Sequence, residues 1–346
     1  MQDIQSISRP PTQWEIVSDR VFRGLTHMFA VLTVLLVAGI IVEIGGAAAP
    51  EIKRLGVGFV TGATWDANKE VYGIKPHIWG TLYTSAIALA IGATFGLAVA
   101  IFLSERFLST AVVGLLKLFG LQFHTFWGKL PDRMELLLKN LIELLAAIPS
   151  VVYGLWGIFV VIPMIRPTCN WIHANFGSAE GILNLSLFNT SLSGPGVLPA
   201  SLVLAIMVLP TISAISRDAL VSVPPKLREA AYGLGATRWE ALLAVIIPTA
   251  QTGIVGSILL AFGRALGETM ALAMLCGNAN TITWSLFSPA NTLAALLANN
   301  FPEAGKNQVG VLMYAALVLM TITLVVNIFG ALVLGHAARR AGGRGR

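Results

Sequence analysis

Long apolar runs separated by short polar segments are the main pattern along this chain. About 20 helical residues, at ~1.5 Å each, are needed to cross a hydrocarbon core of ~30 Å. Most of the runs reach that length, so the pattern predicts an all-α membrane protein with about six transmembrane helices. The expected spans are residues 25–45, 78–103, 141–165, 197–215, 242–276 and 309–334.

Two of these spans contain residues that predict how they pack. Gly92 and Gly96 lie four residues apart in the second span, a spacing that lets another helix approach closely. Pro149 and Gly154 lie inside the third span. A proline removes a helical hydrogen bond, so we expect a kink there whose freed carbonyl is satisfied by a neighbouring group.

The polar segments define the remaining organisation. Residues 1–24 and 339–346 are expected to be terminal segments of a membrane domain at 25–338, and we expect loops at 46–77 and 166–195. In residues 104–140, aromatic and basic side chains are mixed, which favours an interfacial insert over a re-entrant hairpin.

Composition supports a membrane protein and narrows its chemistry. The chain is 55% hydrophobic and 12% charged, with a mean hydropathy of +0.77. Its net charge of +6 is spread over short segments rather than one stripe, which argues against nucleic-acid binding. Cys169 and Cys276 fit no metal-ligand spacing, so we expect no metal site. A disulfide between them and two free thiols are both open.

The distribution of basic residues predicts the topology. The segments at 1–24, 104–140, 216–241 and 339–346 hold 16 of the 23 Lys and Arg residues, whereas the opposite loops hold 6. Cytoplasmic loops carry the excess of Lys and Arg. Both termini and the 218–241 loop are therefore expected in the cytoplasm.

That loop contains a predicted helix at 222–240. Ser222 and the pair Pro224 and Pro225 are typical helix-start residues, because a hydroxyl caps free amides and proline tolerates the first turn. Gly233 and Gly235 predict an early stop. A surface loop without a partner is the alternative interpretation.

A second candidate site lies inside the fifth span. Arg264 and Glu268 are four residues apart and would share one helix face. Charges within a span are costly and usually face a cavity. Two interpretations follow, a structural ion pair between helices or part of an anion pathway, in which a guanidinium presents its fork of donors to an oxyanion.

The residues of the 218–241 loop resemble the coupling-loop motif of bacterial ABC importer permeases. Glu229, Ala230, Ala231 and Gly235 keep the motif's spacing to Pro248, with Val245 and Ile247 as conservative departures. The resemblance implies a type I permease-like bundle with its core at 78–335. It also implies a coupling role for this motif and for the adjoining Arg228, with Glu229 in contact with a cytoplasmic ATPase and Gly235 permitting a sharp turn.

Two further segments, 148–157 and 263–271, resemble phosphate importer permeases, and the latter is closer to the PstC-type subunit than to its PstA-type partner. The resemblance implies a substrate path with Arg264, Glu268 and Thr269. It also implies three kinds of partner: a second permease of the PstA type, a dimer of ATP-binding subunits, and a periplasmic or surface phosphate-binding protein. Molybdate and sulfate permeases have a related segment, so another oxyanion is the alternative substrate.

The chain contains no Gly-x-x-x-x-Gly-Lys-Ser/Thr loop, so we expect it to bind no cofactor and a partner to use ATP and Mg²⁺. The expected protein is therefore not an enzyme, and its expected location is the bacterial inner membrane. Two other classes of protein are the alternatives. One is a secondary transporter coupled to protons through Arg264 and Glu268, and the other is a membrane phosphatase, for which the sequence shows no His, Asp or Ser residues with convincing spacing.

Overall fold

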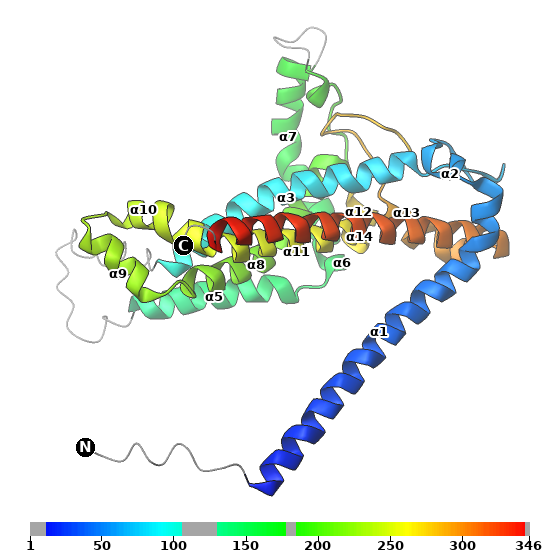
Figure 1. Cartoon of the computed structure of the whole chain (residues 1–346). Helices are drawn as coiled ribbons and strands as arrows, with labels where there is room; N and C mark the ends of the chain where they lie inside the picture. The colour runs from blue at the N-terminus through cyan, green and yellow to red at the C-terminus, as the bar shows by residue number, and fades with distance from the viewer. Residues whose placement is uncertain (1–11, 106–129, 178–184, 343–346) are drawn as a thin grey trace, which may run out of the picture.

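The computed structural model describes residues 12–105, 130–177 and 185–342, and most of these residues are helical (Figure 1). Within them, six helical stretches are long and apolar enough to cross a membrane. The stretches are Gln13–Leu55, Lys75–Ser104, Ser150–Gly177, Val197–Val221, Arg238–Leu266 and Lys306–Gly335. The prediction of an all-α membrane protein with about six spans is confirmed. Part of the terminal segments and most of the 104–140 insert lie outside the described residues.

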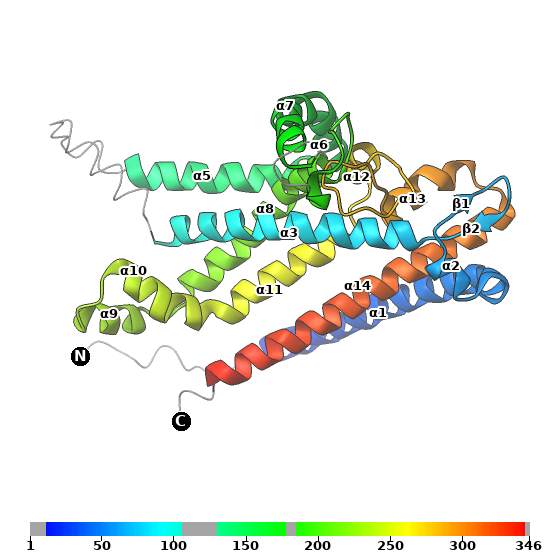
Figure 2. The same cartoon turned by 90° about the horizontal axis from the view of Figure 1, so that it is seen from above.

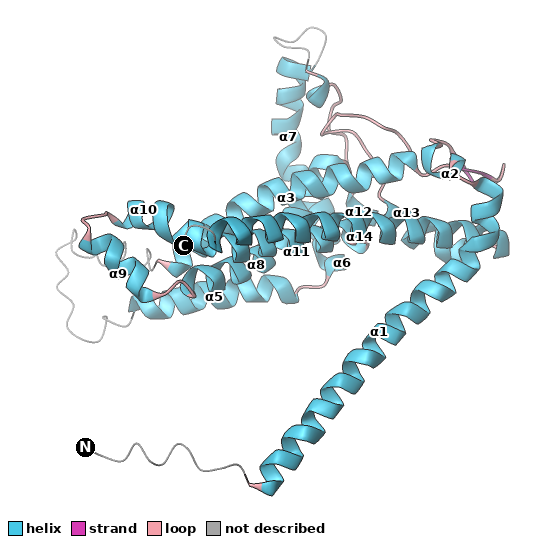
Figure 3. Ribbon diagram, viewed as in Figure 1, coloured by secondary structure: helices cyan, strands magenta, loops and turns pink. Residues whose placement is uncertain are grey.

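The first helix is much longer than predicted. Helix α1 (Gln13–Leu55) begins at a capping box between Thr12 and Glu15 and continues through Pro50. A loop over all of 46–77 is therefore wrong. The remainder of that interval holds the short helix α2 (Gly58–Thr61) and a two-stranded hairpin of β1 (Trp65–Asp66) and β2 (Val71–Tyr72), visible in Figure 3.

The centre of the bundle is the pair of α3 (Lys75–Ser104) and α8 (Val197–Val221). A methyl group added at Gly92 would lie 2.8 Å from Val208 Cγ2, and one at Gly96 would lie 2.9 Å from Ile212 Cβ. The two glycines therefore hold the helices closer than side chains would permit, as their spacing predicts.

The third predicted span is not one helix. It comprises α5 (Leu130–Ala147), α6 (Ser150–Trp156), a π-helical turn and α7 (Ile162–Ile172), with a break at Ile148 and Pro149. The Tyr153 hydroxyl donates to the Leu145 carbonyl at 2.8 Å, so a neighbouring group satisfies an acceptor freed by the break. Figure 1 shows α5 running along the bundle and α7 pointing away from it.

The fifth predicted span is also interrupted. A π-helical turn, Leu242–Ile246, leads into α11 (Ile247–Leu266), and residues 267–269 separate α11 from α12 (Met270–Leu275). Both this turn and the one before α7 end just ahead of a proline, Pro248 or Pro163. A proline ring clashes with the carbonyl four residues earlier, and the wider π turn relieves that clash.

The chain ends with α13 (Leu293–Asn300) and α14 (Lys306–Gly342). The C-terminal part of α1 packs along α14, and Phe59 of α2 stacks on Tyr314 of α14 with the ring centroids 4.5 Å apart. Residues 13–42 of α1 are exposed. Figure 2 places the end of α14, α9 (Pro225–Gly233) and α10 (Arg238–Ala241) at one end of the bundle, with the hairpin at the other. Figure 1 shows α1 diverging from the bundle toward its start.

Candidate functional site

Helices α9 and α10 form the turn between α8 and α11. Pro225 occupies the first turn of α9, as predicted, but the prediction that Ser222 caps this helix is wrong. Ser222 ends α8 instead, and its hydroxyl donates to the Ala219 carbonyl at 2.8 Å. The proline's fixed φ rather than a side-chain cap therefore starts α9.

Gly235 makes the sharp turn after α9. Its φ is +86°, in the left-handed region that favours glycine. The Gly235 amide donates to the Tyr232 carbonyl at 3.0 Å, and the Ala236 amide donates to the Ala231 carbonyl at 3.1 Å. These two bonds are those of a Schellman motif, so the glycine spacing of the sequence has a direct structural reason.

The end of this turn carries exposed apolar side chains. Leu234 is 90% exposed and Trp239 57%, and Glu229 beside them is also exposed. Large apolar groups exposed together with charged ones mark protein interaction sites. We give the name α9–α10 tip to six of the exposed residues in α9, α10 and the turn between them: Leu227, Glu229, Ala230, Tyr232, Leu234 and Trp239.

Arg228 does not belong to this exposed surface. Its guanidinium donates to Glu105 Oε1 at 2.6 Å and to the Leu220 carbonyl at 2.7 Å. Ala231 is buried beneath the helix. The motif residues are thus divided, with Glu229 and Ala230 outward and Arg228 and Ala231 inward. Glu105 is a residue that the sequence did not single out, since nothing in a pattern links it to a partner 123 positions later.

Pro248 lies in the first turn of α11, close to the α9–α10 tip. The Thr249 hydroxyl donates to the Val245 carbonyl at 2.6 Å, which satisfies an acceptor near the proline. Pro248 therefore shapes the entry into α11.

Arg264 and Glu268 do not share a helix face, and that prediction is wrong. Arg264 is in the last turn of α11, which ends at Leu266, whereas Glu268 lies in the break. Glu268 Oε1 accepts from the Ala271 amide of α12 at 3.5 Å, and the Thr269 hydroxyl donates to the Gly267 carbonyl at 3.1 Å. These local bonds stabilise the break in place of a continuous helix.

Arg264 is exposed, and in the described part of the chain no carboxylate lies within salt-bridge distance of it. It lies close enough to the Tyr153 hydroxyl to interact with it electrostatically. A methyl group at Gly154 would lie 2.6 Å from Met274 Sδ, so α6 packs on α12. The two broken spans therefore meet beside Arg264.

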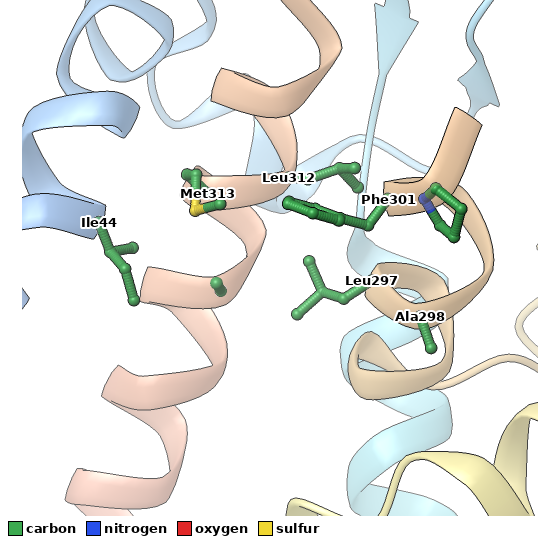
Figure 4. Close-up of a pocket in the computed structure, with 8 residues that line it drawn as sticks. Ile44, Leu297, Ala298, Phe301, Leu312 and Met313 are labelled. Carbon is green, nitrogen blue, oxygen red and sulfur yellow. The ribbon is translucent and has the colours of Figure 1, made fainter. Parts of the chain in front are cut away.

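An apolar hollow of about 480 Å³ lies elsewhere, between α1, α13 and α14 (Figure 4). None of its lining side chains carries a hydrogen-bond donor, so it does not suit an oxyanion. They are Ile44, Leu297, Ala298, Phe301, Pro302, Leu312, Met313 and Ala316.

The two cysteines are free thiols. Cys169 packs in a small cluster with Leu192 and Phe287, whereas Cys276 is in the central core. Both are buried. The alternative of a disulfide is therefore excluded in this structure.

The bundle of membrane-spanning helices, with an exposed helical turn at one end and broken spans inside, defines a multi-pass membrane transport protein. Residues 125–341 match the family described as binding-protein-dependent transport system inner membrane component. The chain belongs to this family, in the branch of its PstC relatives. The phosphate transport system permease protein PstC of Haemophilus influenzae is 39% identical over 318 residues, covering 91% of this chain and 93% of the relative.

Other similarities agree. The phosphate transport system permease protein PstC of Mesorhizobium japonicum is 35% identical over 328 residues, covering 94% of this chain and 93% of that protein. Among solved structures, a chain of a bacterial alginate ABC transporter matches with a TM-score of 0.57 and 14% identity, covering 94% of this chain and 96% of that one. At this identity the similarity concerns the fold alone, and it is the fold of an ABC importer permease.

Proposed function

We propose that this protein is the transmembrane permease subunit of an ATP-driven, binding-protein-dependent importer of inorganic phosphate. The observation that carries the coupling part of this proposal is the exposed α9–α10 tip at the end of a membrane bundle. The substrate is supported by relatives that are named phosphate transport permeases and align over most of both chains. Permeases for molybdate or sulfate are the alternative.

The tip and both termini face the cytoplasm in this proposal. The support is the distribution of basic residues, because the four segments expected in the cytoplasm hold 16 Lys and Arg residues and the opposite loops hold 6. The tip there docks into a groove of a cytoplasmic ATP-binding subunit, with Glu229 as the contacting charge. That partner uses ATP and Mg²⁺. Two copies of it are present, and they bind this chain and a second permease of the PstA type.

A continuous helical segment connects the tip to Arg264. Helix α10 continues through the π turn into α11, and the last turn of α11 carries Arg264. Displacement of the tip by ATPase closure therefore tilts α11 and moves Arg264. A change of this kind switches access to a central path between two states.

Arg264, Glu268 and Thr269 form this chain's part of the substrate path. Irregular backbone at membrane depth is tolerated where it is buried in protein or lines a water-filled cavity, and the break at 267–269 is such a segment. Arg264, without a carboxylate partner in the described residues, offers its fork of donors to an oxyanion. The second permease and a phosphate-binding protein on the outer face complete the path.

Reconstitution tests the proposal. The co-purified complex in proteoliposomes should take up phosphate in preference to molybdate and sulfate, only with ATP and the binding protein present. Uptake of molybdate or sulfate instead would reassign the substrate. Uptake that collapses on dissipating the proton gradient, with ATP held constant, would favour a secondary transporter.

Charge reversal at the tip tests the docking. Glu229→Lys should abolish uptake while the protein remains in the membrane, because the reversed charge repels the partner's basic contact. Glu303→Lys is the matched control, since Glu303 is exposed and is far along the chain from the tip, ahead of α14. Normal uptake by Glu229→Lys would disprove the docking role.

A further inference from the structure

Arg228 joins three helices at the end of the bundle that carries the α9–α10 tip. Its two terminal nitrogens donate to Glu105, which caps the C-terminus of α3, and to the carbonyl of Leu220 in the last turn of α8. The side chains of Arg228 and Glu105 are only 21% and 6% exposed. This fork therefore points into the protein, away from any docked partner.

We propose that Arg228 and Glu105 are a positioning pair that makes α9 move together with α3 and α8. This inference rests on the proposed function, because a partner must displace α9. Helices α3 and α8 already behave as one unit, since Gly92 and Gly96 bring them into close contact. A displacement of α9 is then passed to both helices at their ends.

The position of Glu105 supports this role. A carboxylate at a helix C-terminus interacts unfavourably with the helix dipole, so Glu105 does not stabilise α3 by itself. Its charge is compensated by Arg228. The placement is therefore explained by the contact with α9 and not by helix stability.

The cluster beside α9 is apolar and does not fix the orientation of α9. The ends of α3, α8 and α11 meet in a buried cluster whose members can slide, because apolar contact is non-directional. A two-armed guanidinium fixes both distance and angle. The cluster consists of Ala100, Leu220, Val223, Leu242, Ile246, Ala250 and Ile254. Without the pair, motion of the tip still reaches α8 through residues 222–224 and α11 through α10, but no directional contact passes it to α3.

Uptake per ATP hydrolysed tests the proposal in the complete complex. Glu105→Gln and Arg228→Gln should still hydrolyse ATP, but the phosphate transported per ATP should fall about tenfold, within the usual range of coupling between sites. The double variant Glu105→Arg with Arg228→Glu should regain part of that ratio. Arg217→Gln is the matched control, because Arg217 pairs at 3.4 Å with its neighbour Asp218 and, among the described residues, forms no ion pair with a second helix.

If the complex with Glu105→Gln fails to assemble, Arg228→Lys is used in its place. The lysine ammonium keeps the ion pair with Glu105 but does not reproduce the rigid two-armed contact that also reaches the Leu220 carbonyl. Its ratio should also fall. A native ratio in these variants would overturn the proposal. Loss of the ATPase from the purified complex with a native ratio in what remains would also overturn it, and would make Arg228 a partner contact.

Spin-label distances test the link without reference to the substrate. Labels at Lys226→Cys of α9 and Phe95→Cys of α3 occupy exposed positions outside the named tip residues, and both native thiols are buried. The distance should be the same with and without a non-hydrolysable ATP analogue, and should change with nucleotide once Glu105→Gln is added. The same response in both backgrounds would overturn the proposal. A complex that takes up no phosphate would disprove the proposed function alone.

Discussion

Replacing Gly92 by alanine should weaken the contact between α3 and α8. The added methyl group would lie 2.8 Å from Val208 Cγ2 and 3.2 Å from the Ala205 carbonyl oxygen, whereas comfortable carbon contacts are ~3.5–4.0 Å. Valine has one favoured rotamer in a helix, and the carbonyl belongs to the backbone, so neither group can turn aside. The helices must separate.

The size of the effect follows from two opposing terms. Overpacking a close interface costs about 1–3 kcal/mol, and Gly→Ala inside a helix gains about 1 kcal/mol from helix propensity. We therefore expect a net loss of up to about 2 kcal/mol, seen as a lower midpoint when the detergent-solubilised protein is heated and followed by gel filtration. Gly39→Ala is the matched control, because nothing lies within 4 Å of its added methyl group.

A second substitution separates packing from other causes. Val208→Ala removes the Cγ2 atom that the new methyl group meets, so Gly92→Ala with Val208→Ala should lose less stability than the two single changes added together. The reasoning is refuted if Gly92→Ala melts like Gly39→Ala, or if the double variant loses the full sum.

Three further predictions concern the tip and the breaks. Gly235→Ala should destabilise the tip by about 1 kcal/mol, because its φ of +86° strains any residue with a Cβ, and uptake should fall. Gly233→Ala should change neither the stability of the tip nor uptake, because Gly233 has the same open space around it but no positive φ. Arg264→Gln should abolish uptake while the complex still co-purifies, since only the donor fork is lost. Tyr153→Phe should lower the free energy of unfolding by about 1 kcal/mol, because the Leu145 carbonyl at the break loses its hydrogen-bond donor. The loss should be seen as a lower thermal midpoint.

Each has a distinct contradicting result. Equal midpoints for the two glycine variants would mean that the turn tolerates alanine. Failure of assembly with intact transport in what assembles would make Arg264 a structural residue. An unchanged midpoint for Tyr153→Phe would mean that another donor satisfies the Leu145 carbonyl.

The sequence predicted the spans better than their continuity. Apolar runs show where a helix is long enough to cross, but α5–α6 and α11–α12 are broken within the predicted intervals. The first break was predicted as a kink at Pro149. The second was missed because the four-residue spacing of Arg264 and Glu268 was read as one continuous helix, although Gly267 allows the chain to turn and the Glu268 carboxylate accepts from the next helix.

The candidate site was also predicted only in part. Gly235 was predicted to make a sharp turn, and the required φ is a local property that one residue type satisfies. Arg228 was expected on the coupling surface with Glu229. The structure turns it inward, because consecutive helical residues point in different directions and Glu105 lies within reach on one side only.

By itself, the sequence determined that this is a helical membrane protein, which glycines allow helices to approach, and where the tip turns. These features depend on single residues or on one continuous apolar run. Bilayer thickness sets the length of a span and backbone sterics set the allowed φ, so each can be predicted from a local segment. Only the tertiary structure decided where spans break, which side of α9 is exposed, and that Arg228 meets Glu105. Such contacts join residues far apart in the chain, and their geometry exists only once α3, α8 and α9 are packed.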